Sequence, residues 1–333
     1  MKMKVCPSCL KEGYETFCNP CIKKLFNGKR ISHILPFSQP EFNEVRLSQS
    51  AHLSISGIQI KHSVRLDKSK LILTESGGEY IIKPTPIGSF NYLEATPANE
   101  HLTMQLANQL FNINAPPNAL MQFADGKPAY IVKRFDVLPD GTKLLQEDFA
   151  QLAGKTEENA GKNYKYDFSY EGIAELMKRY INAYPVEIEK YYSLIVFNYL
   201  ICNGDAHLKN FSVFNNVEFG DHILTPAYDL LNTSIHIPDE GDTALQLFKD
   251  DFMTESFKFG SKYAKDDFYA FGVKIGMSKN RIDKTFENFL NKEKSMETMI
   301  KKSFLPEKLK EKYFDSVLAR LKRLEYSYEA ENI

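Results

Sequence analysis

The stretch "NGDAHLKNFSVF", residues 203–214, places several polar side chains next to apolar segments. Asp205 and Asn210 lie five positions apart in it, which reproduces the D-x-x-x-x-N spacing of protein kinase catalytic loops. In phosphoryl transfer such an Asp accepts the proton of the attacking hydroxyl, and such an Asn helps to hold Mg²⁺. The residues before Asp205 are Asn-Gly, where a protein kinase has His-Arg. Because Asp and Asn are also common in turns, the pair needs support from other residues.

Three further residues fit the same chemistry, in the expected order along the chain. Lys83 ends the strand-like segment "EYIIKP", and Glu100 follows early in a helical segment, where it can pair with Lys83. Asp229 in "PAYDLL" follows a short strand, as the second metal-binding Asp of kinases does, although the Phe-Gly after it is missing. Each also has a structural alternative: a solvated strand-end lysine, an acid favoured by a helix dipole, and a helix N-cap. Their joint occurrence favours phosphoryl transfer.

Four of the five cysteines form two short motifs, "CPSC" and "CNPC", separated by eight residues: Cys6, Cys9, Cys18 and Cys21. Two such knuckles can hold one tetrahedral Zn²⁺ with Zn–S bonds of about 2.3 Å. Two disulfides or four free thiols are the alternatives; a reducing cytoplasm disfavours the first, and the regular spacing disfavours the second. Four thiolates leave no open position for catalysis, so the sequence predicts a structural zinc. Cys202 beside an apolar helix is read as a small buried residue.

Strand patterns begin after residues 27–49, which read as a polar connector. "HLSISGIQIKHSVRL" alternates around Gly57, and "KLILTES" and "EYIIKP" read as a hairpin turning at Gly77-Gly78. "ANEHLTMQLANQLF" has helical spacing, with Asn99 placed to cap it. "ALMQFADGKPAYIVKRF" reads as a second hairpin turning at Asp125-Gly126.

From about Asp148 the periodicity is helical. "VEIEKYYSLIVFNYLI" is apolar on nearly every face and predicts a buried central helix, "FSVF" and "HILTPAYDLL" predict short strands, and helical patterns return from residue 265. We therefore predict an α+β, bilobal kinase-like fold. Its expected parts are a zinc-knuckle segment (1–26), a connector (27–50), a small β-rich ATP-binding lobe (51–135) and a helical C-lobe with the catalytic and metal-binding loops (136–333).

Composition limits the classes of partner. The 333 residues are 43% hydrophobic and 26% charged, with a formal net charge of -1, so no global field favours nucleic acid or a membrane surface. No apolar run reaches the roughly 20 residues of a membrane span, and the start has no signal-peptide core. A cytoplasmic location is the expectation.

The motifs together resemble the HipA family of bacterial serine/threonine toxin kinases, from about Ser48 to "RLKRLEY". The resemblance rests on "SISGIQIK", "YIIKP", "NEHLTMQLA", "YIVKRFD", "LLQEDFAQLAG", "NGDAHLKNFSVF" and "TPAYDLL". It is greatest to the short HipT type, which lacks an N-terminal subdomain that a separate small HipS-like protein supplies. The Cys cluster departs from the full-length HipA pattern.

The resemblance implies a role for each site residue. Asp205 is similar to the catalytic Asp, Lys83 to the phosphate-anchoring Lys, and Asn210 and Asp229 to the magnesium ligands. The other residues expected to contact ATP lie in the phosphate loop, the hinge and the two metal-binding loops: Ser56, Gly57, Ile58, Gln59, Ile60, Lys61, Lys133, Arg134, Phe135, His207, Leu208, Lys209 and Tyr228. The hinge usually begins with an acid, but a Lys there does not threaten a main-chain contact.

The resemblance also implies regulation and partners. Ser54 and Ser56 match serines that family members autophosphorylate, and a phosphate there adds negative charge where ATP phosphates must lie; the alternative is that both simply face water. Known substrates of the family are aminoacyl-tRNA synthetases, and a HipB-like DNA-binding antitoxin is an expected partner. Two other classes compete with a kinase: a pseudokinase or nucleotide-binding subunit of a repressor complex, and a zinc protein that binds nucleic acid. The intact site residues count against the first, and the nearly neutral charge and single short Cys module against the second.

Overall fold

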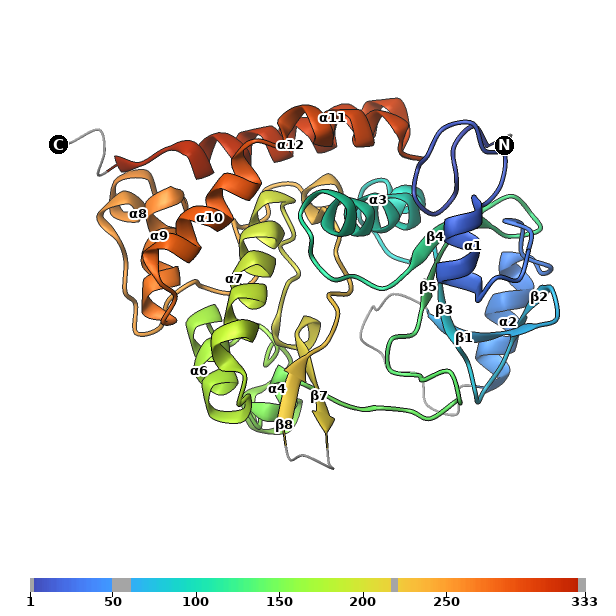
Figure 1. Ribbon diagram of the computed structural model, residues 1–333, viewed down its shortest axis with the longest axis horizontal. Coiled ribbons are helices and arrows are strands. Elements are labelled where there is room, and N and C mark those ends of the chain that lie inside the picture. The colour runs from blue at the N-terminus through green and yellow to red at the C-terminus, as the bar shows by residue number, and fades with distance from the viewer. Residues whose placement is uncertain (1–2, 50–60, 217–220, 329–333) are drawn as a thin grey trace.

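The computed structural model describes residues 3–49, 61–216 and 221–328. They form two lobes, a small sheet-containing lobe on the right of Figure 1 and a helical lobe on the left. The expected α+β, bilobal kinase-like architecture is confirmed. Within these residues no helix combines the length and the apolar character that crossing a bilayer requires.

The small lobe contains an antiparallel five-stranded sheet in the order β2-β1-β3-β5-β4. Its strands are β1 (His62–Asp67), β2 (Lys70–Leu73), β3 (Tyr80–Pro84), β4 (Asn118–Gln122) and β5 (Pro128–Lys133). The β4–β5 hairpin, with Gly126 at a φ of 83°, is confirmed.

The hairpin expected between β2 and β3 is wrong, because β1 lies between these strands and pairs with both. The tight turn is instead between β1 and β2, where Lys68 adopts a φ of 51°. Gly78 serves a close approach rather than a hairpin turn: a Cβ at this position would lie 2.6 Å from the Cβ of Ser63. The Gly77-Gly78 pair therefore suggested a hairpin between two strands that do not pair with each other.

Helix α3 (Thr96–Leu110) packs against this sheet and is buried along most of its length. It follows the short helix η1 (Leu93–Ala95) and begins before Asn99, with Pro97 in its first turn, so Asn99 is not its cap. The Asn99 side chain is instead buried, donating to the carbonyl of Asn232 at 2.8 Å and lying 3.0 Å from His236 Nε2. This contact joins α3 to the loop that follows Asp229.

The N-terminal residues belong to the core of the small lobe. Helix α1 (Asn19–Phe26) buries Leu25 and Phe26 against Tyr80 and Ile82 of β3. Helix α2 (Gln39–Gln49) lies within the segment read only as a polar connector. Among the side chains of α2 that the structure describes, Phe42 is the only buried apolar one, so the sequence shows no helical periodicity there. The stretch "SQPE" does contain a helix-capping pair, since Ser38 Oγ lies 2.7 Å from Glu41 Oε2.

The helical lobe surrounds α7 (Tyr184–Leu200), the predicted buried spine. Its other helices are α4 (Phe149–Leu152), α5 (Glu157–Ala160), α6 (Tyr170–Tyr180), η2 (Leu208–Asn210), η3 (Thr233–Ile235), α8 (Glu255–Gly260), α9 (Lys265–Lys274), α10 (Lys279–Leu290), α11 (Glu293–Lys302) and α12 (Glu307–Glu325). A three-stranded antiparallel sheet is formed by β6 (Leu145–Asp148), β7 (Ser212–Asn216) and β8 (Asp221–Leu224). Helix α11 packs on both α12 and α3, and this C-terminal pair runs along the top of Figure 1 toward the small lobe.

Candidate active site

A buried lysine joins the two lobes. Lys83 on β3 is 5% exposed, and its Nζ lies 2.6 Å from Oε1 of Glu100 on α3 and also donates to Oδ1 of Asp229. The Tyr130 ring lies 5.6 Å from the same ammonium. Asp229 follows β8 and has a φ of 55°, a left-handed conformation that Asp adopts more readily than most residues. Three residues from distant parts of the chain therefore meet as one ion-paired group.

The charges of this group support one another. Burial opposes the charged form of Lys83, but the carboxylates of Asp229 and Glu100 outweigh it and raise the pKa of Lys83 above its ordinary value. Burial would likewise raise the pKa of Asp229, yet Lys83, followed by Lys61 and His207, lowers it below its ordinary value. Asp229 is therefore an ionised carboxylate at neutral pH, which is the form that binds a hard cation. Lys61 contributes to the same electrostatic environment.

The loop after α7 holds Asp205 by its backbone. Cys202 ends the helix with a φ of 56°, and the side chain of Asn203 accepts from the Asp205 N–H at 3.2 Å. The Asp205 carbonyl accepts from the His207 N–H at 2.8 Å. The carboxylate itself is 52% exposed and accepts a hydrogen bond from the Tyr166 hydroxyl. A fixed backbone thus presents an accessible carboxylate, as a proton acceptor requires.

Two polar atoms beside Asp205 lack partners. Asn210 Oδ1 and His207 Nδ1 are buried, and neither has a hydrogen-bond partner among the residues that the structure describes. Burial lowers the pKa of His207, so its imidazole is neutral at neutral pH, with Nε2 3.7 Å from Asp205 Oδ1. Since buried oxygens are normally satisfied, the Asn210 oxygen fits a site for a bound cation, together with the ionised Asp229.

The residues predicted to form the hinge lie at the end of β5 and directly after it. The Lys133 and Arg134 N–H groups donate to the carbonyls of Pro117 and Glu79, each at 2.8 Å, while no described residue accepts from the Phe135 N–H. The Lys133 side chain donates from Nζ to Asn27 Oδ1 at 2.6 Å. The Phe135 ring lies 5.7 Å from the ring of Tyr228, whose hydroxyl donates to the Lys209 carbonyl.

The structure does not cover every predicted residue. Ser54, Ser56, Gly57, Ile58, Gln59 and Ile60 lie outside the described residues. Leu208 is buried in η2, and Lys209 beside it is exposed.

Sequence reasoning missed Tyr166, in the segment before α6, and Tyr170, the first residue of α6, which both contact the Asp205 loop. The Tyr166 ring lies 5.1 Å from the ring of His207, and the Tyr170 hydroxyl donates to the Ala206 carbonyl at 2.9 Å. Nothing local in "NYKYDFSY" indicates contact with a loop about forty residues later.

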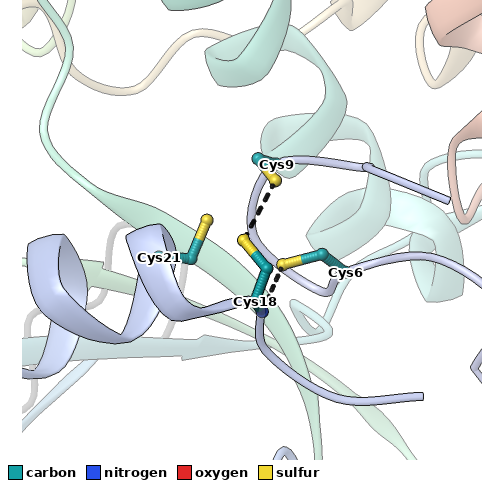
Figure 2. A group of neighbouring side chains, drawn as sticks. All are labelled: Cys6, Cys9, Cys18 and Cys21. Atoms are coloured by element: carbon teal, nitrogen blue, oxygen red, sulfur yellow. Dashed lines mark hydrogen bonds between the residues drawn. The ribbon is translucent and has the colours of Figure 1, made fainter. Parts of the chain in front are cut away.

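The four N-terminal cysteines form a second candidate site. Their sulfur atoms all lie within 4.8 Å of one another and point toward a common centre (Figure 2). The 3.7 Å separation of Cys9 and Cys18 matches the S–S distance of about 3.8 Å in a tetrahedral Zn–thiolate centre. Hydrogen bonds from Cys21 and Cys9 lower the pKa of Cys6, and the contact with Cys6 raises the pKa of Cys21, so four thiolates need a cation to coexist. The cluster is compatible with zinc.

The bilobal fold and the ion-paired group around Lys83 define a kinase-like protein. The HipA-like C-terminal domain family matches residues 53–296, and the chain belongs to this family.

Relatives and solved structures agree with this family. A Haemophilus influenzae protein named "Putative kinase" is 28% identical over 298 residues, 85% of each chain. "Putative kinase Y4dM" of Sinorhizobium fredii is 32% identical over 212 residues, 58% of this chain and 48% of its own length. The fold is similar to a chain of the Shewanella oneidensis MR-1 toxin–antitoxin complex of HipA, HipB and operator DNA, with a TM-score of 0.64 and 20% identity over 88% of this chain and 73% of that one. It is also similar to the Helicobacter pylori proinflammatory kinase CtkA, with a TM-score of 0.50 and 16% identity over 78% of this chain and 93% of that one.

Proposed function

We propose that this protein is an ATP-dependent serine/threonine protein kinase of the short HipT type that acts in the cytoplasm. The observation that carries the proposal is the buried Lys83, which contacts both Glu100 and Asp229. In an active kinase the equivalent lysine is held by a helix glutamate so that it can meet nucleotide phosphates, and an Asp nearby holds the metal. A structural role alone would not require a buried Asn210 oxygen that no described residue contacts by a hydrogen bond.

Each residue then has a role. ATP with Mg²⁺ supplies the transferable phosphoryl group and neutralises its charge. Lys83 orients the phosphates, while Asn210 and Asp229 hold the metal. Asp205 accepts the proton of the substrate hydroxyl, and the Phe135 N–H, from which no described residue accepts, binds the adenine edge.

The regulation and partners implied by the resemblance belong to the same proposal. Ser54 and Ser56 would be phosphorylated by the enzyme itself, and the added charge would oppose ATP binding. The protein substrate would be of the aminoacyl-tRNA synthetase class. A HipB-like antitoxin is supported by the Shewanella oneidensis complex, which contains HipA and HipB, whereas a small HipS-like partner rests on the resemblance alone.

Incubation of the protein with labelled ATP, Mg²⁺ and a cell lysate tests the activity directly. Labelled lysate proteins that carry phosphoserine or phosphothreonine would support the proposal. ATP binding without any transfer to protein would favour a pseudokinase.

Replacement of the proposed metal ligand Asn210 should weaken ATP binding only when Mg²⁺ is present. We expect Asn210→Ala to lower ATP affinity in Mg²⁺ by roughly tenfold, because one ligand to a charged group is lost. Titration calorimetry with and without Mg²⁺ measures the difference. Asn215→Ala on neighbouring β7, where the side chain donates to Glu147 Oε2 at 3.4 Å, is the matched control. Equal affinities of wild type and Asn210→Ala in Mg²⁺ would remove Asn210 from the site.

The Cys cluster is proposed to hold one structural zinc. Freshly purified protein should contain about one zinc per chain, and Cys9→Ser should lose it, since tetrahedral sites of this kind need all four ligands. Cys202→Ser should retain the metal, because Cys202 lies outside the cluster. Metal analysis by mass spectrometry measures the zinc content of the wild type and of both variants. Wild-type protein without zinc would refute the assignment.

A further inference from the structure

The first cysteine knuckle is attached to helix α3 by its backbone. The Ser8 carbonyl lies 2.8 Å from His101 Nε2, and the Cys9 carbonyl accepts from Gln109 Nε2 at 3.1 Å. The turn is also fixed to β4, where the Leu120 N–H donates to the Pro7 carbonyl at 2.9 Å. Residues within the "CPSC" turn therefore hold both α3 and the neighbouring strand.

The contacts on α3 follow one face of the helix. His101, Gln105 and Gln109 are spaced by four residues, and Gln109 also donates to Gln105 Oε1 at 2.7 Å. Gln105 in turn donates to Asn118 Oδ1 at 2.8 Å. Glu100, the partner of Lys83, directly precedes His101 on the helix, and its buried carboxylate contacts Lys83 Nζ. A movement of the first cysteine knuckle would therefore shift the face of α3 that it contacts, and Glu100 with it.

His101 makes this connection specific. Its side chain is completely buried, and because a carbonyl can only accept, Nε2 carries the proton in the contact with Ser8. Burial lowers the pKa of His101 to about 4, so the ring is neutral at neutral pH and the contact is a neutral hydrogen bond. The knuckle itself has no regular strand or helix to hold its carbonyls in place before α1 begins at Asn19. Its turn is closed by two backbone hydrogen bonds, from the Cys6 N–H to the Lys11 carbonyl at 2.8 Å and from the Leu10 N–H to the Cys6 carbonyl at 3.0 Å, and a metal ion held by the cysteines would add to them.

We propose that a zinc ion bound by the four cysteines positions helix α3, and through it the Glu100–Lys83 pair, from outside the ATP cleft. A bound zinc fixes Cys6 and Cys9 relative to α1, and so fixes the carbonyls of Ser8 and Cys9 that α3 contacts. Metal loading is then a condition for the active geometry. The catalytic consequence rests on the proposed kinase function, whereas the positioning of α3 does not.

Hydrogen exchange on the full-length protein tests the positioning. We expect removal of zinc by a chelator to speed amide exchange in α3 by about tenfold, the effect of losing one or two hydrogen bonds, while α9 at the far end of the helical lobe stays unchanged. Unchanged exchange in α3 would overturn the proposal. Equal acceleration in α3 and α9 would also overturn it, because zinc would then stabilise the whole chain and not this helix.

Two variants distinguish the effect of the Gln109–Cys9 hydrogen bond on α3 from the effect of the metal. Gln109→Ala, at an exposed position, should keep its zinc but raise exchange in α3. Asn108→Ala, at the preceding position of the same helix, removes a contact with the Ala115 carbonyl and none with the knuckle, and should not raise it. Identical exchange in the two variants would count against the contact. Activity and ATP affinity of loaded and stripped protein are measured in parallel. If neither form transfers phosphate while α3 still responds to zinc, the proposed kinase function fails and the positioning stands.

Discussion

Asp205→Asn should abolish phosphotransfer while leaving the protein folded. An amide cannot accept the proton of the substrate hydroxyl, and a positioned general base contributes about 10²–10⁴-fold in rate. The side chain is half exposed and its place in the loop is fixed by backbone contacts, so the fold should tolerate the change. Initial rates of label transfer and a thermal melt measure the two effects. Mass spectrometry should find phosphate on Ser54 or Ser56 in wild type and none in Asp205→Asn expressed alone.

Asp125→Asn makes the same chemical change at the β4–β5 turn and should keep wild-type rates, since Asn-Gly suits that turn equally well. A wild-type transfer rate in Asp205→Asn would exclude Asp205 as the proton acceptor. Phosphate on Ser54 or Ser56 in the inactive variant would mean that another kinase places it there, and self-regulation would fail.

Local patterns predicted the elements whose signals are contained within them. The apolar run around α7 and the Asp125-Gly126 turn each determine their structure over a few residues, and both are confirmed. The pairing of β1 with two strands was missed because Gly78, one of the two glycines that suggested a β2–β3 turn, serves a close approach to Ser63. Helix α2 was missed because, among its side chains that the structure describes, Phe42 is the only buried apolar one.

The order of the site residues along the chain was readable, but their geometry was not. Lys83 and Asp229 are 146 residues apart, and no sequence pattern requires them to touch. Family resemblance supplied their roles, and the fold supplies their contact. The Cys cluster shows the reverse case: spacing indicated that the sulfur atoms could converge, but nothing indicated that the knuckle would contact the helix that carries Glu100.

Lys83→Met should remove nucleotide binding and also destabilise the protein strongly. The variant leaves Glu100, which is 2% exposed, without its ammonium partner, and breaking a buried ion pair in this way costs about 3–5 kcal/mol in the free energy of unfolding. Urea unfolding of the full chain measures the loss. Lys301→Ala is the matched control, since Lys301 and Glu297 are 2.6 Å apart but largely exposed and should contribute less than about 1 kcal/mol.

The pH dependence of the Lys83→Met variant distinguishes an ion pair from simple packing. In the wild type the raised pKa of Lys83 means that its contribution is complete below its ordinary value near 10.4 and is lost only as the pH rises through the higher folded value. The lowered pKa of Asp229 means that its contribution is complete above its ordinary value near 3.9 and is lost as the pH falls through the lower folded value. The wild-type contribution of this pair is therefore constant between about pH 5 and 9. In the variant, Asp229 loses Lys83, the first of the charges that lower its pKa, while burial still raises that pKa. The folded state of the variant therefore binds more protons than that of the wild type, and its stability falls as the pH rises relative to wild type. The loss relative to wild type should accordingly be larger at pH 8 than at pH 5; an equal loss at both pH values would mean that Lys83 stabilises the lobes by packing alone.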